Sequence, residues 1–322
     1  MQVINITKNN CSLIEPLLKG YEYNDFRRYA GVSIDGLNRY MKLAFFELLD
    51  GNKKNRIICL IDKGEAIGFA TINFLKFDSE IFGLPMAKIS YIIIKKEEPR
   101  VALLIRERLL KEAIIVCRQK KIAHISCRVD TEDMRSAHAL ERSGFRIMDV
   151  LVTLAYARLR SRRFNTRLIY KIGEVRKKDV TKLMKLAAVS FQNDRFHLDC
   201  SLDAYKADML YAQWIKNSYI GKEKIFVAID TKDNPVGFLT YKINRNFQLA
   251  TGRKVMGQGL MAVDKNAKGA LISLMKATFT EDSRVYDYVE YDTRLNNPEV
   301  IRACNYFGLR MVRAKYTFHK SL

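Results

Sequence analysis

Two side chains that could recognise and activate a substrate occur close together in the stretch DRFHLD at residues 194–199. The guanidinium of Arg195 could hold a phosphate by two parallel hydrogen bonds. The imidazole of His197 could act as a general base near neutral pH. Asp78 and Glu80 are alternative bases. The ordinary alternative for Arg195 is a helix-capping or surface role, so the stretch indicates a substrate site only together with other residues.

A second group of candidate residues lies in the stretch YAQWIKNS at residues 211–218. Tyr211, Trp214 and Ser218 are spaced three and four apart, so they share one face of the expected helix. Aromatic residues at this spacing often pack in a core. The face therefore predicts either part of a binding site or a buried contact between elements.

The elements that would position these residues follow from apolar periodicity and from turn residues. In the first half we expect strands at 2–7, 56–62, 66–76, 86–95, 122–129 and 145–158, and helices at 11–30, 34–50, 100–120 and 133–143. In the second half we expect strands at 167–174, 224–230, 236–244, 256–263, 285–292 and 309–318, and helices at 178–190, 203–218, 268–279 and 298–307.

The element order is the same in both halves, and the sequence itself repeats. The spacing between Gly68 and Gly237 along the chain nearly equals the spacing between Gly144 and Gly308. Two marker pairs with nearly the same offset indicate a duplicated unit of about half the chain. We therefore predict an α/β layered fold of two tandem domains, 1–160 and 161–322, each with a mixed, mostly antiparallel sheet flanked by helices.

The charge of the chain favours anionic partners. The net charge is +21, of which residues 1–163 contribute +10 and the remainder contributes +11. Such evenly distributed basicity suits phosphorylated or nucleotide-linked small molecules or an acidic carrier protein, although it also serves solubility. The sequence contains no recognised nucleic-acid-binding module, and its most basic cluster, at 158–163, falls in the expected linker.

The rest of the composition indicates the cellular compartment and argues against a membrane span and a cysteine metal site. No apolar run reaches the length of about 18 residues that a membrane span requires, and the N-terminus lacks the layout of a signal peptide. We therefore expect a cytoplasmic protein. The six cysteines are scattered, without metal-ligand spacing even around His124, so we expect reduced thiols and no metal.

The order of elements resembles that of the GNAT acyltransferase superfamily, once in each half of the chain. More closely, the segments FDSEIFG (77–83), DRFHLD (194–199) and YAQWIKNS (211–218) resemble those of bacterial TDP-fucosamine N-acetyltransferases. This resemblance implies acetyl-CoA, or another acyl-CoA, as donor and a nucleotide-linked amino sugar as acceptor. It also implies that Phe82, Arg195, Tyr211 and Trp214 contribute to the acceptor site.

The resemblance further implies a donor site in the second half. The strand that ends with Met261, Ala262 and Val263 would bind pantetheine. The loop that follows it contains Lys265, Lys268, Gly269 and Ala270, and it would hold the pyrophosphate at a helix N-terminus. This loop has a single Gly, fewer than is typical of the superfamily, and an ordinary strand-to-helix turn is the alternative.

The corresponding loop of the first half runs from Lys95 to Arg100 and differs in its chemistry. It has no Gly, and Glu97 and Glu98 stand where a pyrophosphate would sit. We therefore expect the first domain to be a degenerate, non-catalytic GNAT-like domain that supports the second.

The last helix of the second half would carry the remaining donor contacts. Asn297 is a good N-cap and a candidate pantetheine contact. In the superfamily, a Tyr that acts as the general acid stands four residues before the Gly that ends this helix. This chain has Cys304 at that position. Three interpretations remain open. Cys304 is a weak acid or a packed bystander, Tyr306 replaces it through a shifted helix end, or the domain binds an acyl carrier without transfer.

These observations together predict a tandem GNAT N-acyltransferase that acts on the amine of a nucleotide-linked sugar or a similar small molecule. One alternative is a non-catalytic binding or scaffold protein. Another is a transferase that uses an acyl carrier protein or an aminoacyl-tRNA. We expect no membrane partner, nucleic acid is the less favoured partner, and a homodimer is left open.

Overall fold

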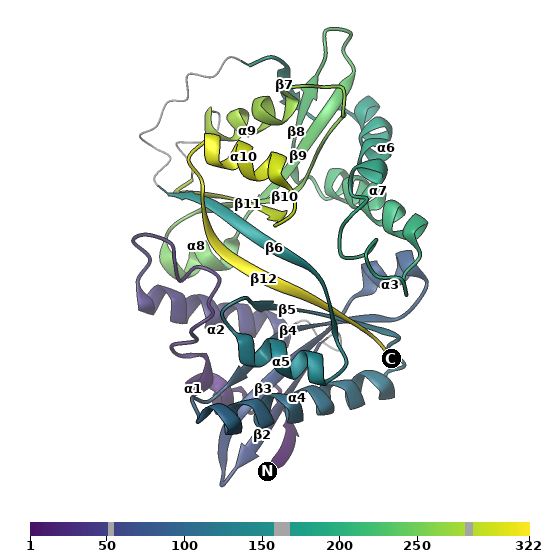
Figure 1. Ribbon diagram of the computed structural model, residues 1–322. Coiled ribbons are helices and arrows are strands. Elements are labelled where there is room, and N and C mark those ends of the chain that lie inside the picture. The colour runs from purple at the N-terminus through teal and green to yellow at the C-terminus, as the bar shows by residue number, and fades with distance from the viewer. Residues whose placement is uncertain (51–54, 158–167, 281–285) are drawn as a thin grey trace. The chain divides into compact units, whose positions relative to one another are not determined.

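The computed structural model describes residues 1–50, 55–157, 168–280 and 286–322 (Figure 1). The chain divides into two compact units. The first unit contains residues 1–150 and 314–322, and the second contains residues 151–313. Among the helices of the described ranges, none is long and apolar enough to cross a bilayer.

The first unit contains a mixed sheet with the strand order β1-β2-β3-β4-β5-β12. Its strands are β1 (Gln2–Asn5), β2 (Asn55–Asp62), β3 (Glu65–Phe74), β4 (Met86–Ile94), β5 (His124–Asp130) and β12 (Arg310–Ser321). Strands β4 and β5 pair in parallel, and the other pairs of this order for which a register is given are antiparallel.

Helices pack on this sheet through apolar faces. They are α1 (Glu15–Leu18), α2 (Ile34–Asp50), α3 (Lys76–Phe82), α4 (Pro99–Gln119) and α5 (Met134–Arg142), and a 3-10 turn at Cys11–Ile14 precedes α1. Along α4, Ile105, Leu109 and Ala113 recur at helical spacing and lie in the main apolar cluster. Burial of this stripe fixes the helix against the strands.

The second unit has the strand order β6-β11-β10-β9-β8-β7. Its strands are β6 (Arg146–Ala157), β7 (Lys171–Glu174), β8 (Lys224–Ile229), β9 (Pro235–Ile243), β10 (Val255–Val263) and β11 (Tyr288–Arg294). Here β10 and β11 pair in parallel, and the other neighbouring pairs are antiparallel. Each sheet is therefore mixed and mostly antiparallel, as the sequence predicts.

The helices of the second unit follow the same order. They are α6 (Val180–Ser190), α7 (Ala204–Ile220), α8 (Arg245–Thr251), α9 (Ala270–Thr280) and α10 (Pro298–Tyr306), with a 3-10 turn at Lys177–Asp179 before α6. The marker glycines of the repeat lie in equivalent close contacts. A Cβ on Gly68 would come within 2.9 Å of Ile94, and a Cβ on Gly237 would come within 2.9 Å of Val263.

The two units are not the two halves of the sequence. They differ from the halves in the strands that end each repeat, β6 and β12. Residues 315–321 of β12 pair with β5, and Phe318 is fully buried in the apolar cluster of the first unit. Residues 151–157 of β6 pair with β11 of the second unit. The predicted boundary at 160 and the basic cluster at 158–163 lie outside the described residues.

The prediction of a continuous helix at 11–30 is wrong. Helical structure ends at Leu18, and Gly20 has φ +74°, a left-handed conformation that interrupts the helix. Asn24 then holds a turn, because its Oδ1 accepts a hydrogen bond from the amide of Phe26 at 3.0 Å. The segment between α1 and α2 is therefore a loop.

Two short helices were not predicted, and they are related by the repeat. Lys76–Phe82 forms α3, and Arg245–Thr251 forms α8, at the same offset that separates Gly68 from Gly237. Each ends in a left-handed glycine, Gly83 at φ +67° and Gly252 at φ +70°. The stretch FDSEIFG, which carried part of the resemblance, therefore forms this helix and its C-terminal glycine.

Candidate functional site

In the second unit, a bulge marks the point where β10 and β11 part. The two strands pair in parallel over Val255–Gly257. Just beyond, the pairing of β10 with β9 shifts by one residue between Gln258 and Met261. Bulges of this kind bend a strand and re-aim its backbone, and they are common beside active sites. Past Gly257, along residues 258–263, the edge of β10 that faces away from β9 is therefore no longer paired with β11.

One threonine side chain holds this bulge. Thr240 of β9 lies opposite the extra residue, and its Oγ1 accepts a hydrogen bond from the amide of Leu260 at 2.7 Å. A bulge removes an amide from the regular ladder, and a buried amide without a partner is costly. Thr240 therefore satisfies the amide that the bulge displaces.

The first unit repeats the same arrangement. Strands β4 and β5 pair in parallel over Met86–Ile89, and the register of β4 against β3 then shifts between the partners of Ala70 and Ile72. The amide of Tyr91 donates to Thr71 Oγ1 at 3.0 Å. Thr71 and Thr240 occupy equivalent positions of the duplicated unit, so the repeat has preserved both the bulge and the side chain that holds it.

The predicted pyrophosphate loop of the second unit is a compact turn. The amide of Ala267 donates to Asp264 O at 2.9 Å, that of Lys268 to Asn266 O at 3.0 Å, and that of Ala270 to Ala267 O at 3.0 Å. Gly269 has φ +87°, and a Cβ there would come within 2.6 Å of Ile169. These three amides are already bonded within the loop, whereas the side chains of Lys265 and Lys268 are exposed.

The predicted pantetheine strand lies within β10. Met261, Ala262 and Val263 pair with Leu239, Phe238 and Gly237 of β9. Their other strand edge is the one described above, past the last parallel pair with β11. An extended ligand could add to such an edge by main-chain hydrogen bonds.

The corresponding loop of the first unit is more acidic. Lys96, Glu97 and Glu98 are exposed, and Lys95 is paired with Glu65 at 2.8 Å. Glu98 is the N-cap of α4, and Pro99 follows at the first helical position. The two carboxylates lie at the helix end where an anion would otherwise be favoured. That this unit does not bind the donor stays a prediction.

The last helix of the second unit has the predicted ends. Asn297 is the N-cap of α10, with Oδ1 at 3.5 Å from the Val300 amide, and Gly308 has φ +77° after the C-terminus. The side chains of Cys304 and Tyr306 lie on different sides of this helix. Cys304 is fully buried, and burial raises the pKa of its thiol to about 12, whereas Tyr306 is 58% exposed. This geometry favours Cys304 as a packed residue.

The DRFHLD stretch forms part of the loop between α6 and α7. The Nδ1 atom of His197 is 2.8 Å from Asp194 Oδ1, and its Nε2 atom is 3.1 Å from Asp208 Oδ1. Both ring nitrogens therefore have carboxylate neighbours, and the side chain is almost completely buried. This contact set suits a residue that holds the loop more than one that meets a substrate.

The other predicted acceptor residues are placed differently from one another. The guanidinium of Arg195 lies 4.1 Å from the ring centre of Phe196, and Arg195 is half-buried. Tyr211 is buried and stacks on Phe191 at 4.3 Å, whereas Trp214 is 39% exposed. Phe82, which ends α3 in the first unit, is 1% exposed and belongs to the core.

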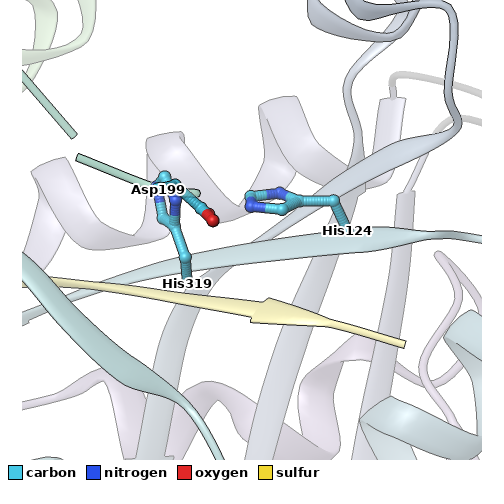
Figure 2. A group of neighbouring side chains, drawn as sticks. All are labelled: His124, Asp199 and His319. Atoms are coloured by element: carbon cyan, nitrogen blue, oxygen red, sulfur yellow. The ribbon is translucent and has the colours of Figure 1, made fainter. Parts of the chain in front are cut away.

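Two histidines of the first unit lie side by side on neighbouring strands. His124 begins β5, and His319 lies opposite Ser126 in β12. Their buried rings meet edge to face, with centroids 4.6 Å apart. Figure 2 shows the two side chains. Asp199, also labelled there, belongs to the second unit, where its Oδ1 accepts hydrogen bonds from the amide and hydroxyl of Ser201. The absence of a metal stays a prediction.

Sequence comparison finds no matching family model and no matching curated protein. Structure comparison does find matches. One is a tandem GNAT protein from the clavulanic acid biosynthesis pathway, with a TM-score of 0.58 and 12% identity over 99% of this chain and 98% of that one. Another is a GCN5-related N-acetyltransferase from Sphaerobacter thermophilus, with a TM-score of 0.63 and 13% identity over 99% and 95% of the two chains.

A third similar structure is a glucosamine N-acetyltransferase region in a fungal multi-domain GH3 β-N-acetylglucosaminidase. It aligns with a TM-score of 0.66 and 12% identity over 99% of this chain but only 38% of the larger one. At such low identity these similarities establish the fold. The chain has the tandem GNAT fold over its whole length, as the resemblance predicts.

Proposed function

We propose that this protein is an N-acyltransferase that moves an acyl group, acetyl from acetyl-CoA in the simplest case, to the amine of a small molecule. The observation that carries this proposal is the bulged strand β10, which parts from β11 at Gly257 within a tandem GNAT fold. That strand edge would receive an extended donor, and main-chain amides along it would polarise the acyl carbonyl of the donor.

The donor is assigned to the second unit. The edge of Met261–Val263 would receive the pantetheine, and Lys265 and Lys268 would approach the phosphates from the exposed side of the loop. The three loop amides that are bonded internally give little of a backbone cradle, so charge from the lysines would dominate the phosphate contacts. The first unit has Glu97 and Glu98 in the equivalent place, which disfavours a second donor site.

Direct attack of the amine on the thioester, without an acyl-enzyme intermediate, is the proposed route. The buried Cys304 takes no part, because its side chain is fully enclosed and a thiol with a pKa of about 12 is too weak an acid to protonate a departing thiolate. The departing thiolate would then take its proton from water. A free thiol has a pKa of about 8.5, so this step proceeds near neutral pH without a dedicated acid.

Glu290 is the proposed base for the attacking amine. It lies in β11 beside Gly257, and a Cβ on Gly257 would come within 3.2 Å of its Oε1. This places a half-buried carboxylate at the point where the two strands part. If Glu290 is the base, Glu290→Gln should lower kcat and remove the acidic limb of the pH–rate profile. An unchanged profile would refute the assignment.

A nucleotide-linked amino sugar is the proposed acceptor. Its phosphates suit the basic chain and the half-buried Arg195, which lies in the loop between α6 and α7. A panel of amino sugars with and without a nucleoside diphosphate would be tested for release of the CoA thiol. Preferential turnover of the nucleotide-linked sugars, lost in Arg195→Ala, would support this acceptor. Equal turnover of the free sugars would refute it.

The donor site is tested by isothermal titration of acetyl-CoA into the purified chain. We expect one site per chain and weaker binding by Lys268→Glu. The control, Lys96→Glu, changes the same charge in the loop of the first unit and should leave the affinity unchanged. Failure of acetyl-CoA to bind at high concentration would end the assignment of CoA as the donor.

A non-catalytic binding protein is the second candidate, and two specific observations favour it. The amides of Ala267, Lys268 and Ala270 are bonded within the loop, and Cys304 stands buried at the position of the usual acid. Binding of acetyl-CoA without transfer to any amine of the panel would identify this candidate. Turnover would exclude it.

A further inference from the structure

The two neighbouring histidines of the first unit stand on one face of its sheet. In the register of β5 and β12, His124 lies opposite Ser321, and His319 lies opposite Ser126. Residues opposite each other in antiparallel strands point to the same face, and so do residues two apart along one strand. His124, Ser126 and His319 therefore share a face, with the two histidines as diagonal neighbours across the two strands.

The other face of the same two strands is apolar. Ile125 and Cys127 of β5 and Phe318 of β12 alternate with the residues above, and all three belong to the main apolar cluster. The sulfur of Cys127 thus lies on the face away from the histidines. The expectation of no metal came from the spacing of the cysteines, so it does not bear on a pair that contains no cysteine.

The two imidazole rings are close enough to bind one ion together. A ring nitrogen of His124 and one of His319 lie within 4.8 Å of each other. Two imidazoles on one tetrahedral Zn²⁺ ion, with each bond about 2.0–2.1 Å long, place their nitrogens about 3.3 Å apart. Because the rings already meet with centroids 4.6 Å apart, a small rotation of the two side chains gives that spacing.

The pair is buried, but it lies at the end of its strands. His124 is 1% exposed and His319 is 2% exposed. His124 is the first residue of β5, and His319 stands two residues before the end of β12. An ion could therefore reach the two rings from the end of the sheet without passing through the apolar cluster.

Ser126 provides a second observation on the same face. Its side chain is 3% exposed, and its Oγ atom has no hydrogen-bond partner among the residues that the structure describes. A buried hydroxyl without a partner is costly, and a bound water or ion is a common explanation for one. Since Ser126 lies directly opposite His319, a water held by an ion at the two histidines would provide this partner.

The surrounding charges decide which kind of ion fits. Lys88 of β4 pairs with Ser126, and Arg128 follows along β5, where its Nε donates to Thr317 Oγ1 at 3.1 Å. The paired stretches 86–89, 124–127 and 318–321 contain no carboxylate. Ca²⁺ and Mg²⁺ require oxygen ligands, so this site disfavours them. Neutral imidazoles suit Zn²⁺, Ni²⁺ and Cu²⁺, whose coordination would have to outweigh the nearby basic charges.

We propose that His124 and His319 bind one divalent transition-metal ion, with Zn²⁺ as the ion to be tested, through one ring nitrogen each. Water would fill the remaining positions, with one water hydrogen-bonded to Ser126 Oγ. The ion would link β12 to β5 and so fasten residues 314–322 to the rest of the first unit. This structural role is independent of the acyl transfer proposed for the second unit.

The first test is isothermal titration of Zn²⁺ into the full chain. It uses a Cys200→Ser background, because the exposed thiol of Cys200 would also bind Zn²⁺. We expect one ion per chain, a higher unfolding temperature with Zn²⁺, and slower hydrogen exchange of the β5 and β12 amides. Mg²⁺ has the same charge and should produce none of these effects. Absence of saturable Zn²⁺ binding, or an equal response to Mg²⁺, would overturn the proposal.

A ring substitution separates metal binding from aromatic packing. His319→Phe keeps an aromatic ring for the edge-to-face contact but removes the ligand. It should weaken Zn²⁺ binding about tenfold or more and abolish the thermal shift. His138→Phe makes the same change at an exposed histidine of α5 and should leave the affinity unchanged. Binding by His319→Phe as tight as that of the parent would mean that the pair only packs, which contradicts the proposal.

A measurement on the parent protein does not depend on how the variants fold. The chain has four histidines, whose imidazole ¹H–¹⁵N resonances can be followed during the titration. Zn²⁺ should shift the signals of His124 and His319 and leave those of His138 and His197 in place. His197 is the rival ligand, because both of its ring nitrogens have carboxylate neighbours. A shift of His197 without shifts of the pair would place the ion in the loop between α6 and α7 and overturn the proposal.

Discussion

One threonine side chain in each unit explains how the bulge of that unit is stabilised. Thr71 and Thr240 each accept a hydrogen bond from the amide that a bulge displaces from its ladder, at 3.0 and 2.7 Å. A valine has nearly the same shape but no acceptor, so it would leave a buried amide without a partner. The threonine hydroxyl, and not the size of the side chain, is thus what makes a stable bulge possible at these positions.

Gly259 leads to the first prediction. A Cβ at this position would come within 2.4 Å of Thr240 Oγ1, the acceptor of the bulge amide. Gly259→Ala should therefore push the hydroxyl away and destabilise the protein by about 1–3 kcal/mol. Urea unfolding followed by circular dichroism would measure the loss. Gly173→Ala is the control, because its Cβ would meet Ile229 at an ordinary 3.8 Å, and an equal loss there would contradict the explanation.

The cysteines lead to a prediction about pH. Burial raises the pKa of Cys59 to about 11 and those of Cys117, Cys127 and Cys304 to about 12, whereas Cys200 is exposed. At pH 8, Cys200 and the half-buried Cys11 should react quickly with a disulfide reagent, and the four buried thiols should react only after unfolding. Counting the thiolate released before and after adding guanidinium checks this.

The same pKa shifts fix the sign of an effect on stability. The folded state holds the buried thiol protons above pH 9, where the unfolded chain releases them, so these thiols reduce stability as pH rises from about 9 towards 12. Fast reaction of three or more thiols in the folded protein at pH 8 would show that at least one of the four buried thiols is accessible.

The candidate site could be predicted from the sequence only where its signal is local. The position of Asn297 at the start of its helix follows from capping chemistry, and the structure has this cap. The pair of His124 and His319 could not be predicted, because its two residues come from strands that are far apart in the sequence. The apolar periodicity across 11–30 predicted a helix where the structure has a loop. Gly20 and Gly31, which both have positive φ, are the residues that could have indicated the loop.

At the scale of elements, the repeat itself would have found the helices that periodicity missed. Helices α3 and α8 have only seven residues each, too few for a clear helical pattern. Gly83 and Gly252 nevertheless stand at the same offset along the chain as Gly68 and Gly237. Comparison of the two halves would therefore have predicted a turn or helix end at both positions.

Strand β12 leads to a prediction at this scale. Phe318 is fully buried in the cluster of the first unit, whereas Met311, on the same strand, is 51% exposed. Phe318→Ala should destabilise the first unit by about 3–5 kcal/mol because it leaves a cavity. Met311→Ala should change stability by about 0.5 kcal/mol or less. Hydrogen exchange of β5 amides would report the effect, and unchanged protection in Phe318→Ala would contradict the pairing of β12 with β5.

The whole molecule has a duplicated order of elements, and its two compact units do not divide at the middle of the sequence. The offset between equivalent elements is constant up to β4 and β10, and it is slightly smaller from β5 and β11 onward. The change therefore falls between those strands, in the segment that contains α4 in the first unit and α9 in the second. Local patterns predicted this duplicated order, but the exchange of the final strands is a long-range pairing that periodicity does not encode.

The exchange makes a prediction about fragments of the chain. A fragment of residues 1–160 lacks the part of β12 that pairs with β5, so it should expose the edge of β5 and lose the contacts of Phe318. It should aggregate or unfold. A fragment that joins 1–150 to 314–322 through a flexible linker contains the whole first unit and should fold cooperatively. Circular dichroism and thermal unfolding would compare the two. If the first fragment were as stable as the second, residues 314–322 would not be part of the core of the first unit.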